Sequence, residues 1–287
     1  MRDFSQDHRW LSINTATLRR QADLVGIVEA CARAQIRAID PWRDQVSAVG
    51  LSRAVKAVKD AALELSGYCR GGMFTADGAR LPEARDDNCR AVDEAAALGA
   101  ACLVLVVGGL PQYSRPGSAP SKDLLAARAQ VEEEIAALLE HARSVGMPLA
   151  LEPLHPMYAA DRACVNTLAQ ALDICDRLDP DRAGGIGVAV DVYHVWWDPA
   201  LWDGIARAGR DRLLAYHVCD WLVPTRDMLN DRGMMGDGVV DLKRVRAAVE
   251  AAGYAGFSEV EIFSEDWWGR PLAEVLDTCI ARHKAVV

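Results

Sequence analysis

The feature that most constrains the fold of this chain is a regular alternation of short apolar runs with longer segments of helical periodicity. Such an alternation is typical of parallel βα units. The predicted strands are Trp10–Asn14, Ile36–Asp40, Leu63–Cys69, Ala101–Val107, Pro148–Glu152, Gly187–Asp191, Leu213–Cys219 and Ser258–Phe263. The predicted helices are Leu18–Arg33, Arg53–Leu63, Asp87–Leu98, Leu124–Val145, Leu168–Leu178, Leu242–Ala252 and Leu272–His283.

The number of units distinguishes between the two common architectures of this class. Eight units in 287 residues average about 36 residues each, which fits a (β/α)8 barrel better than a doubly wound sheet of about five or six strands. No G-x-G-x-x-G follows a predicted strand, and the glycines of GGIGVAV at 184–190 precede a strand instead of opening a helix. We therefore predict an α/β fold with a single (β/α)8 TIM barrel over residues 1–287.

The net charge and the apolar runs of the sequence limit which partners and which cellular location we expect. The formal net charge is −9 and the pI is near 5.2, so we expect neither nucleic acid nor an anionic membrane as a partner. No apolar run approaches the ~18 residues of a membrane span, and the first ten residues lack the apolar core of a signal peptide. We therefore expect a cytoplasmic protein, in which the eight cysteines are reduced and mostly buried.

Two segments are expected to be long loops on the catalytic face of the barrel. The segment 112–122 is rich in Pro, Gly and Ser and follows the fourth predicted strand, and Leu222–Gly238 follows the seventh. In barrels of this kind the loops that follow the strands carry the chemistry.

Residues that can bind a metal stand at or near the ends of the last four predicted strands. They are Glu152, Asp191, His217 and Glu261. Because strand ends converge on one rim of a closed barrel, these side chains should be neighbours. Three adjacent carboxylates would repel one another unless a cation lies between them. The sequence therefore predicts a divalent metal site, with Mn²⁺ expected first and Mg²⁺, Co²⁺ and Zn²⁺ left open.

Several motifs around these residues resemble the xylose isomerase-like barrels called sugar phosphate isomerases/epimerases. They are LSINTATL at 11–18, LALEP around Glu152, D-x-x-H from Asp191 to His194, H-x-x-D from His217 to Asp220, G-D-G at 236–238 and Y-x-G followed by VEIF around Glu261. The resemblance extends from residue 11 to the final predicted helix. It implies that the four residues hold the metal, and that Glu152 and Glu261 also transfer protons. Glu259 is the competing carboxylate, because strand alternation places it on the same face as Glu261.

The resemblance implies a divalent-metal-dependent sugar isomerase or epimerase. Such an enzyme removes the proton next to a carbonyl and passes through a metal-stabilised enediolate. A metal-dependent lyase or dehydratase is the alternative, because the same step followed by β-elimination would cleave a keto sugar, a keto-glycoside, including a C-glycoside, or a keto-cyclitol. Tyr158 stands where ketose 3-epimerases, which resemble this chain, carry a second glutamate. This difference weakens the hypothesis that the substrate is a free ketose. An abasic-site endonuclease shares this barrel, but six histidines and the acidic net charge argue against it.

Further side chains are predicted to bind a small-molecule sugar or sugar derivative. They are His155, His194, Asp220, Arg232, Trp196 and Trp221. Basic residues on the later loops are sparse apart from Arg226, Arg232 and Arg270, so the family name alone does not imply a phosphorylated substrate. Six tryptophans follow the second, sixth, seventh and eighth predicted strands, which leaves room for a homo-oligomer or a partner subunit over the rim.

Overall fold

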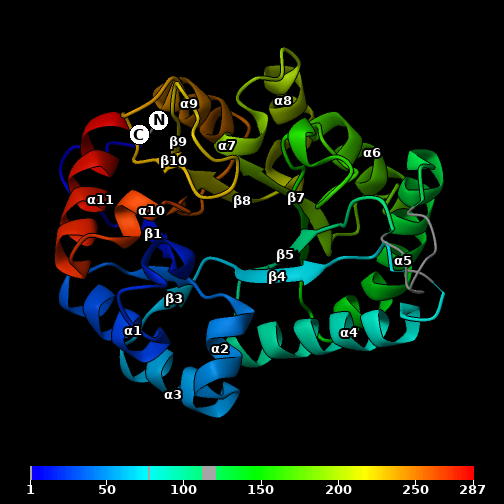
Figure 1. Ribbon diagram of the computed structural model, residues 1–287, viewed down its shortest axis with the longest axis horizontal. Helices are drawn as coiled ribbons and strands as arrows, with labels where there is room; N and C mark the ends of the chain where they lie inside the picture. The colour runs from blue at the N-terminus through cyan, green and yellow to red at the C-terminus, as the bar shows by residue number, and fades with distance from the viewer. Residues whose placement is uncertain (1, 77, 112–120) are drawn as a thin grey trace.

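Helices surround a curved sheet of nine parallel strands in the computed structural model, which describes residues 2–76, 78–111 and 121–287 (Figure 1). The strands of this sheet are β1 (Leu11–Asn14), β2 (Ala38–Asp40), β3 (Glu64–Leu65), β4 (Tyr68–Gly72), β5 (Leu103–Val106), β6 (Leu149–Leu151), β7 (Ile186–Asp191), β8 (Leu213–Val218) and β11 (Ser258–Val260). Their spatial order is β3-β2-β1-β11-β8-β7-β6-β5-β4. The predicted α/β TIM barrel is therefore confirmed as a nearly closed parallel barrel.

The number of strands differs from the prediction because the third predicted strand, Leu63–Cys69, is two strands. β3 pairs with β2, and β4 pairs with β5. Between them, Gly67 lies so close to β2 that a Cβ atom would stand 2.4 Å from Oδ2 of Asp40. Only a glycine permits this approach, and the chain changes its pairing partner here.

All seven predicted helices are present, with shifted bounds in several cases and additional helices between them. The helices are α1 (Leu24–Arg33), α2 (Arg43–Val49), α3 (Leu51–Asp60), α4 (Leu81–Leu98), α5 (Leu124–Ser144), α6 (Leu168–Leu178), α7 (Val192–Val195), α8 (Leu201–Arg212), α9 (Leu242–Ala251), α10 (Glu265–Trp268) and α11 (Leu272–Val286), with 3-10 turns at Thr15–Leu18 and Pro156–Tyr158. The first predicted helix, Leu18–Arg33, begins only at Leu24. Neither α2 nor α8 was predicted, and α8 contains Gly209 at a φ of 59°, which interrupts helical periodicity.

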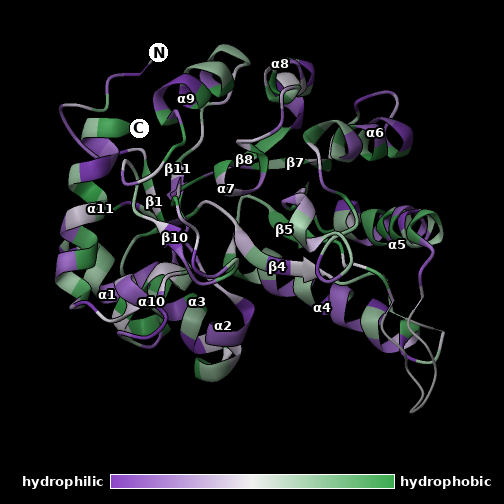
Figure 2. Ribbon diagram, turned by 45° about the horizontal axis from the view of Figure 1, so that its top comes forward, coloured by the Kyte–Doolittle hydropathy of each residue, from purple (hydrophilic) through white to green (hydrophobic). Residues whose placement is uncertain are grey.

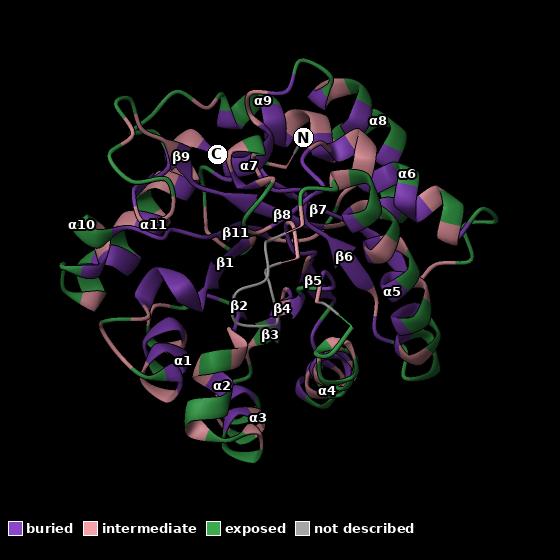
Figure 3. Ribbon diagram, turned by 45° about the vertical axis from the view of Figure 1, so that its right-hand side comes forward, coloured by how far each residue is buried: buried purple, intermediate pink, exposed green. Residues whose placement is uncertain are grey.

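The core lies between the strands and the inner faces of the helices. The barrel strands are buried almost throughout, whereas the outer helices carry exposed residues on their solvent side (Figure 3). Hydrophilic and hydrophobic residues accordingly alternate along helices such as α4 and α11 (Figure 2). All eight cysteines are free, and seven of them are buried, as predicted. Within the described residues, no helix is both long and apolar enough to cross a membrane.

Only one of the two predicted long loops can be compared with the structure. The segment Leu222–Gly238 contains a short strand, β10 (Arg232–Gly233), which pairs antiparallel with β9 (Asp220–Trp221). This hairpin folds the segment back over the barrel and carries Arg232 to the site described below. Most of the other predicted loop, residues 112–120, lies outside the described residues.

Candidate active site

Four buried side chains from neighbouring strands converge at the carboxyl end of the barrel. Glu152 directly follows β6, Asp191 ends β7, His217 lies in β8 and Glu261 directly follows β11. One possible ligand atom from each lies within 4.8 Å of those of the other three. The structure thus brings together all four predicted metal ligands, because β11, β8, β7 and β6 are adjacent in the barrel.

His217 is at the centre of this cluster and contacts carboxylates through both ring nitrogens. Its Nδ1 is hydrogen-bonded to Oε1 of Glu152 at 3.0 Å, and its Nε2 lies 3.4 Å from Oε1 of Glu259. Burial alone would lower the pKa of His217, but Glu259, Glu152 and Glu261 together raise it well above its ordinary value. The imidazole is therefore a cation when nothing else neutralises these carboxylates.

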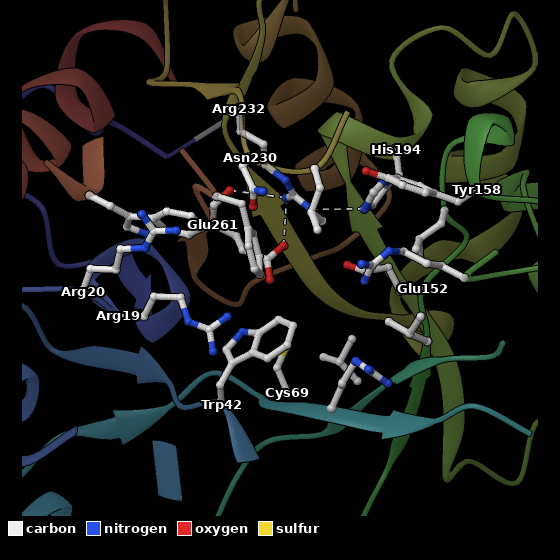
Figure 4. Close-up of a pocket in the computed structure, with 18 residues that line it drawn as sticks. Arg19, Arg20, Trp42, Cys69, Glu152, Tyr158, His194, Asn230, Arg232 and Glu261 are labelled. Atoms are coloured by element: carbon white, nitrogen blue, oxygen red, sulfur yellow. Dashed lines mark hydrogen bonds and ion pairs between the residues drawn. The ribbon is translucent and has the colours of Figure 1, made fainter. Parts of the chain in front are cut away.

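Arg232 supplies a second positive charge to the cluster. From β10, its Nη1 donates to Oδ2 of Asp191 at 2.8 Å and to Oε2 of Glu261 at 2.9 Å (Figure 4). Burial raises the pKa of Glu261 to about 8, with Glu152 adding to the shift and Arg232 opposing it. At neutral pH Glu261 is thus close to its own pKa, which suits a group that gives and takes protons.

His194 lies beside Arg232 and is a neutral imidazole. Burial lowers the pKa of His194 to about 3. Its Nδ1 accepts from the backbone N–H of His155 at 3.2 Å, and Nη2 of Arg232, which can only donate, lies 3.2 Å from its Nε2. That nitrogen lies 3.6 Å from Oδ2 of Asp191. His194 therefore contacts Arg232 as a neutral ring at the cavity wall.

A cavity of about 450 Å³ opens above the cluster. Glu152, Glu261, His194 and Arg232 line it, whereas Asp191 and His217 are not among its lining residues. Figure 4 shows Arg19 and Trp42 on the side of the cavity away from His194 and Tyr158. A substrate in this space would therefore meet two carboxylates of the cluster directly.

The other predicted substrate-binding residues lie beside the cavity and not among its lining residues. His155 stacks on Trp221 with ring centroids 4.9 Å apart, and Trp196 packs against the same indole at 5.5 Å. Both carboxylate oxygens of Asp220 accept backbone N–H groups, including those of Gly236 and Val240. In the structure these four residues support the loop after β8, and their predicted contact with substrate stays a prediction.

Several cavity residues were missed by sequence reasoning. They are Arg19, Arg20, Arg70 and Arg162, whereas Trp42 is one of the tryptophans already noted to follow strands. The basic residues named from the later loops behave differently, since Arg226 pairs with Asp231 and Asp266, and Arg270 pairs with Glu274. A signal was present for Arg70, because it directly follows the predicted strand Leu63–Cys69 and so stands at a strand end.

The donor set fits a divalent cation. Three carboxylates and one imidazole give the oxygen-rich ligation that Mn²⁺, Mg²⁺ and related ions accept. Two cationic side chains, His217 and Arg232, bind these carboxylates in the structure. The negative charge of the three carboxylates thus requires nearby positive charge, which a divalent cation would also supply. Glu152, Asp191, His217 and Glu261 therefore form a candidate buried metal site.

Glu259 lies on the opposite side of His217 from the candidate site. It accepts hydrogen bonds from Nδ2 of Asn14 at 2.9 Å and from Oγ of Ser66 at 2.8 Å. With Asp40 and His217 it forms a second close group of possible ligands. However, burial, together with the neighbouring Glu259, raises the pKa of Asp40 well above its usual range. Asn14 and Ser66 hold Glu259 beside Nε2 of His217, so this group supports the histidine ligand.

We expect Glu259→Gln to weaken metal binding by about 10- to 100-fold, the usual effect of losing the partner that orients a histidine ligand. The carboxylate at Nε2 favours the tautomer whose Nδ1 lone pair faces Glu152 and Glu261. Affinity for Mn²⁺ can be measured by competition with a chromophoric chelator. Ser66→Ala, which removes only one hydrogen bond to Glu259, should have a much smaller effect, and equal affinities in all three proteins would contradict this role.

Comparison with known proteins identifies similar chains. A family model described as xylose isomerase-like TIM barrel matches residues 26–281. A protein from Sinorhizobium meliloti 1021 is similar in sequence and fold, with 60% identity and a TM-score of 0.91 over 96% of this chain and 98% of that chain. The inosose isomerase of Bacillus velezensis is 26% identical over 162 residues, which are 54% of each chain. The matched region thus spans about half the length of such curated relatives.

A more distant solved structure shares the fold. The IolI protein, solved with a bound zinc atom, has a TM-score of 0.77 at 19% identity, covering 94% of each chain. At this level of identity the likeness concerns the fold alone.

Proposed function

The chain belongs to the xylose isomerase-like TIM barrel family, and from this premise we propose that it is a divalent-metal-dependent sugar isomerase or epimerase. One observation carries the proposal: four ligand-type side chains converge within 4.8 Å, and two of them, Glu152 and Glu261, also line a cavity of about 450 Å³. Metal and substrate could therefore contact the same carboxylates. The inosose isomerase activity of a distant relative is consistent with this chemistry.

Each residue at the cavity has a role in the proposed reaction. A divalent cation held by Glu152, Asp191, His217 and Glu261 would supply Lewis acidity towards a carbonyl oxygen of the substrate. The carboxylate of Glu152 or Glu261 removes the proton from the carbon next to that carbonyl, and the other carboxyl returns a proton. Arg232, with the neutral ring of His194 beside it, places a positive charge next to the oxygen that becomes negative.

The final proton transfer determines the product. A proton returned to the opposite face of the same carbon gives an epimer, and a proton delivered to the neighbouring carbon gives an isomer. If the substrate carries a leaving group β to the carbonyl, removal of the proton next to the carbonyl is followed by loss of that group. The enzyme is then a lyase. The carboxyl groups of Glu152 and Glu261, both bordering the cavity, are compatible with proton transfer at either carbon.

The test is NMR-detected uptake of deuterium from D₂O into a panel of ketoses and 3-keto sugars. The protein is loaded with Mn²⁺, and a chelator-treated sample is the control. We expect exchange at the carbon next to a carbonyl in the loaded sample only, with the product spectrum separating epimer, isomer and eliminated fragment. Exchange that persists after chelation would refute the metal dependence, and no exchange with any sugar would refute the proposal.

A further inference from the structure

Arginine side chains dominate the charge of the cavity wall. Arg19, Arg20, Arg70, Arg162 and Arg232 line the cavity, against the two carboxylates of Glu152 and Glu261. Those two carboxylates belong to the candidate metal site, so a bound divalent cation would take up their charge as well. A cavity of this kind attracts negatively charged ligands.

The five arginines differ in whether another residue already neutralises them. Arg20 makes a two-pronged pair with Glu265, including an Nη2–Oε1 contact of 2.7 Å, and Arg19 pairs with Asp44. Arg232 is bound to Asp191 and Glu261. These three have carboxylate partners within the protein and need no ligand to satisfy them.

Arg70 has no such partner. Within the part of the chain that the structure describes, it forms no hydrogen bond or ion pair, although it is half-buried. Burial lowers the pKa of Arg70, and repulsion from Arg162 and Arg43 lowers it further. A guanidinium withdrawn from water without a counterion is costly, and an anionic group beside it would offset that cost.

The local backbone directs Arg70 into the cavity. β4 loses its regular register against β5 between Cys69 and Gly71. In a regular strand successive side chains point to opposite faces, yet Cys69 and Arg70 both line the cavity. Irregularities of this kind often redirect a side chain next to an active site.

Besides burial, the positive charge of Arg162 lowers the pKa of Arg70, so the two guanidinium groups of Arg162 and Arg70 are neighbours. Arg162 lines the cavity together with Arg70, and the two also share the walls of a second, adjacent cavity. Its only carboxylate contact among the described residues is with Asp161 at 3.5 Å, and both side chains of that pair are exposed, so solvent screens it strongly. Two guanidinium groups facing one space match the geometry of a carboxylate or a phosphate.

We propose that the substrate is an anionic sugar, whose carboxylate or phosphate group binds Arg70 and Arg162 while its carbonyl end lies against Glu152 and Glu261. This inference rests on the proposed function for the carbonyl end, whereas the anion site stands on the arginines alone. It narrows the substrate class from any keto sugar to keto acids of the uronate or aldonate kind and to sugar phosphates.

The first experiment measures anion binding without catalysis. Inorganic phosphate and malonate are titrated into metal-free protein, at low ionic strength, by isothermal titration calorimetry. Because no metal ion is present, neither anion can bind by coordinating a metal. We expect Arg70→Gln to weaken binding about tenfold or more, since a hydrogen bond to a charged group contributes about 1.5–3 kcal/mol. Arg162→Gln should also weaken it, and Arg70→Lys should restore part of the loss.

The matched control is Arg20→Gln, which removes the same charge from the same cavity wall but from an arginine already paired with Glu265. We expect it to change anion affinity by less than about twofold. Thermal unfolding of each variant verifies that it is folded. Failure of both anions to bind the unaltered protein would overturn the inference, as would equal losses in Arg20→Gln and Arg70→Gln. Stronger binding of malonate or of phosphate distinguishes the two anion types.

The deuterium-exchange panel then separates this inference from the proposed function. Each keto sugar is tested in neutral, carboxylate and phosphate form. Deuterium exchange that occurs only with the anionic forms, and that Arg70→Gln abolishes, supports both the proposed function and the anionic substrate. Exchange only with neutral sugars confirms the enzyme activity and overturns the anionic substrate. No exchange with any sugar refutes the proposed function, while calorimetry still decides whether the anion site exists.

Discussion

Glu261→Gln is expected to reduce turnover by about a thousandfold or more and to leave the protein folded. The substitution keeps the size of a side chain that lines the cavity but removes a proton-transfer group, whose loss typically costs about 10²–10⁴ in rate, and it also removes one metal ligand. The measurement is initial rate at saturating Mn²⁺ on whichever sugar shows deuterium exchange. Retained activity would refute the assignment of Glu261.

The same variant provides a test of pH dependence. Because burial raises the pKa of Glu261 to about 8, a metal must displace a proton from it at neutral pH. Metal affinity of the unaltered protein should therefore increase as pH rises through about 8, and the proton that cationic His217 must also release adds to this increase. Glu261→Gln should bind more weakly and lose the part of this dependence that comes from Glu261. Glu274→Gln, in an exposed pair with Arg270, makes the same chemical change away from the site and should match the unaltered protein in both experiments.

Arg232→Met is expected to destabilise the metal-free protein by about 3–5 kcal/mol, because it leaves buried carboxylates without their partner. Arg232 is 4% exposed and bonds to both Asp191 and Glu261. A bound divalent cation would neutralise those carboxylates, so the loss should be smaller with Mn²⁺ present. Denaturant unfolding with chelator and with Mn²⁺ measures the two values. By linkage, the variant should bind Mn²⁺ more tightly than the unaltered protein while turning over more slowly.

Arg212→Met is the matched control for this experiment. Arg212 is also buried and bonds to Asp179 at 2.6 Å, but Asp179 is not among the clustered ligand residues. Its loss should destabilise the protein equally with and without Mn²⁺. If Arg232→Met behaved in the same metal-independent way, Arg232 would be an ordinary buried ion pair and not a substitute for the cation's charge.

Features of the fold that depend on local periodicity could be predicted from the sequence. α6 has the predicted bounds, Leu168–Leu178, because its apolar residues recur with helical period and Thr167 caps its first turn by accepting from Gln170. The split of the third strand could not be predicted, because it occurs where Gly67 approaches Asp40 of the neighbouring strand β2, a contact between residues far apart in sequence. α8 was missed because two glycines and few apolar residues mask its periodicity.

The candidate site shows the same division. Glu152, Asp191, His217 and Glu261 could be found because each stands at or near the end of an apolar run, and topology alone brings such ends together. Arg70 could not be placed in the cavity, because its direction depends on the irregular register of β4. Trp196 and Trp221 follow strands as well, but they pack against each other, and sequence spacing does not reveal in which direction a loop side chain points.

The residues around the cavity come from different parts of the barrel according to their role. The possible metal ligands follow or lie in β6, β7, β8 and β11, whereas Arg19, Trp42 and Arg70 belong to the segments of β1, β2 and β4. Substitutions in the first third of the chain can therefore change the wall of the cavity while leaving the four clustered ligand-type side chains in place.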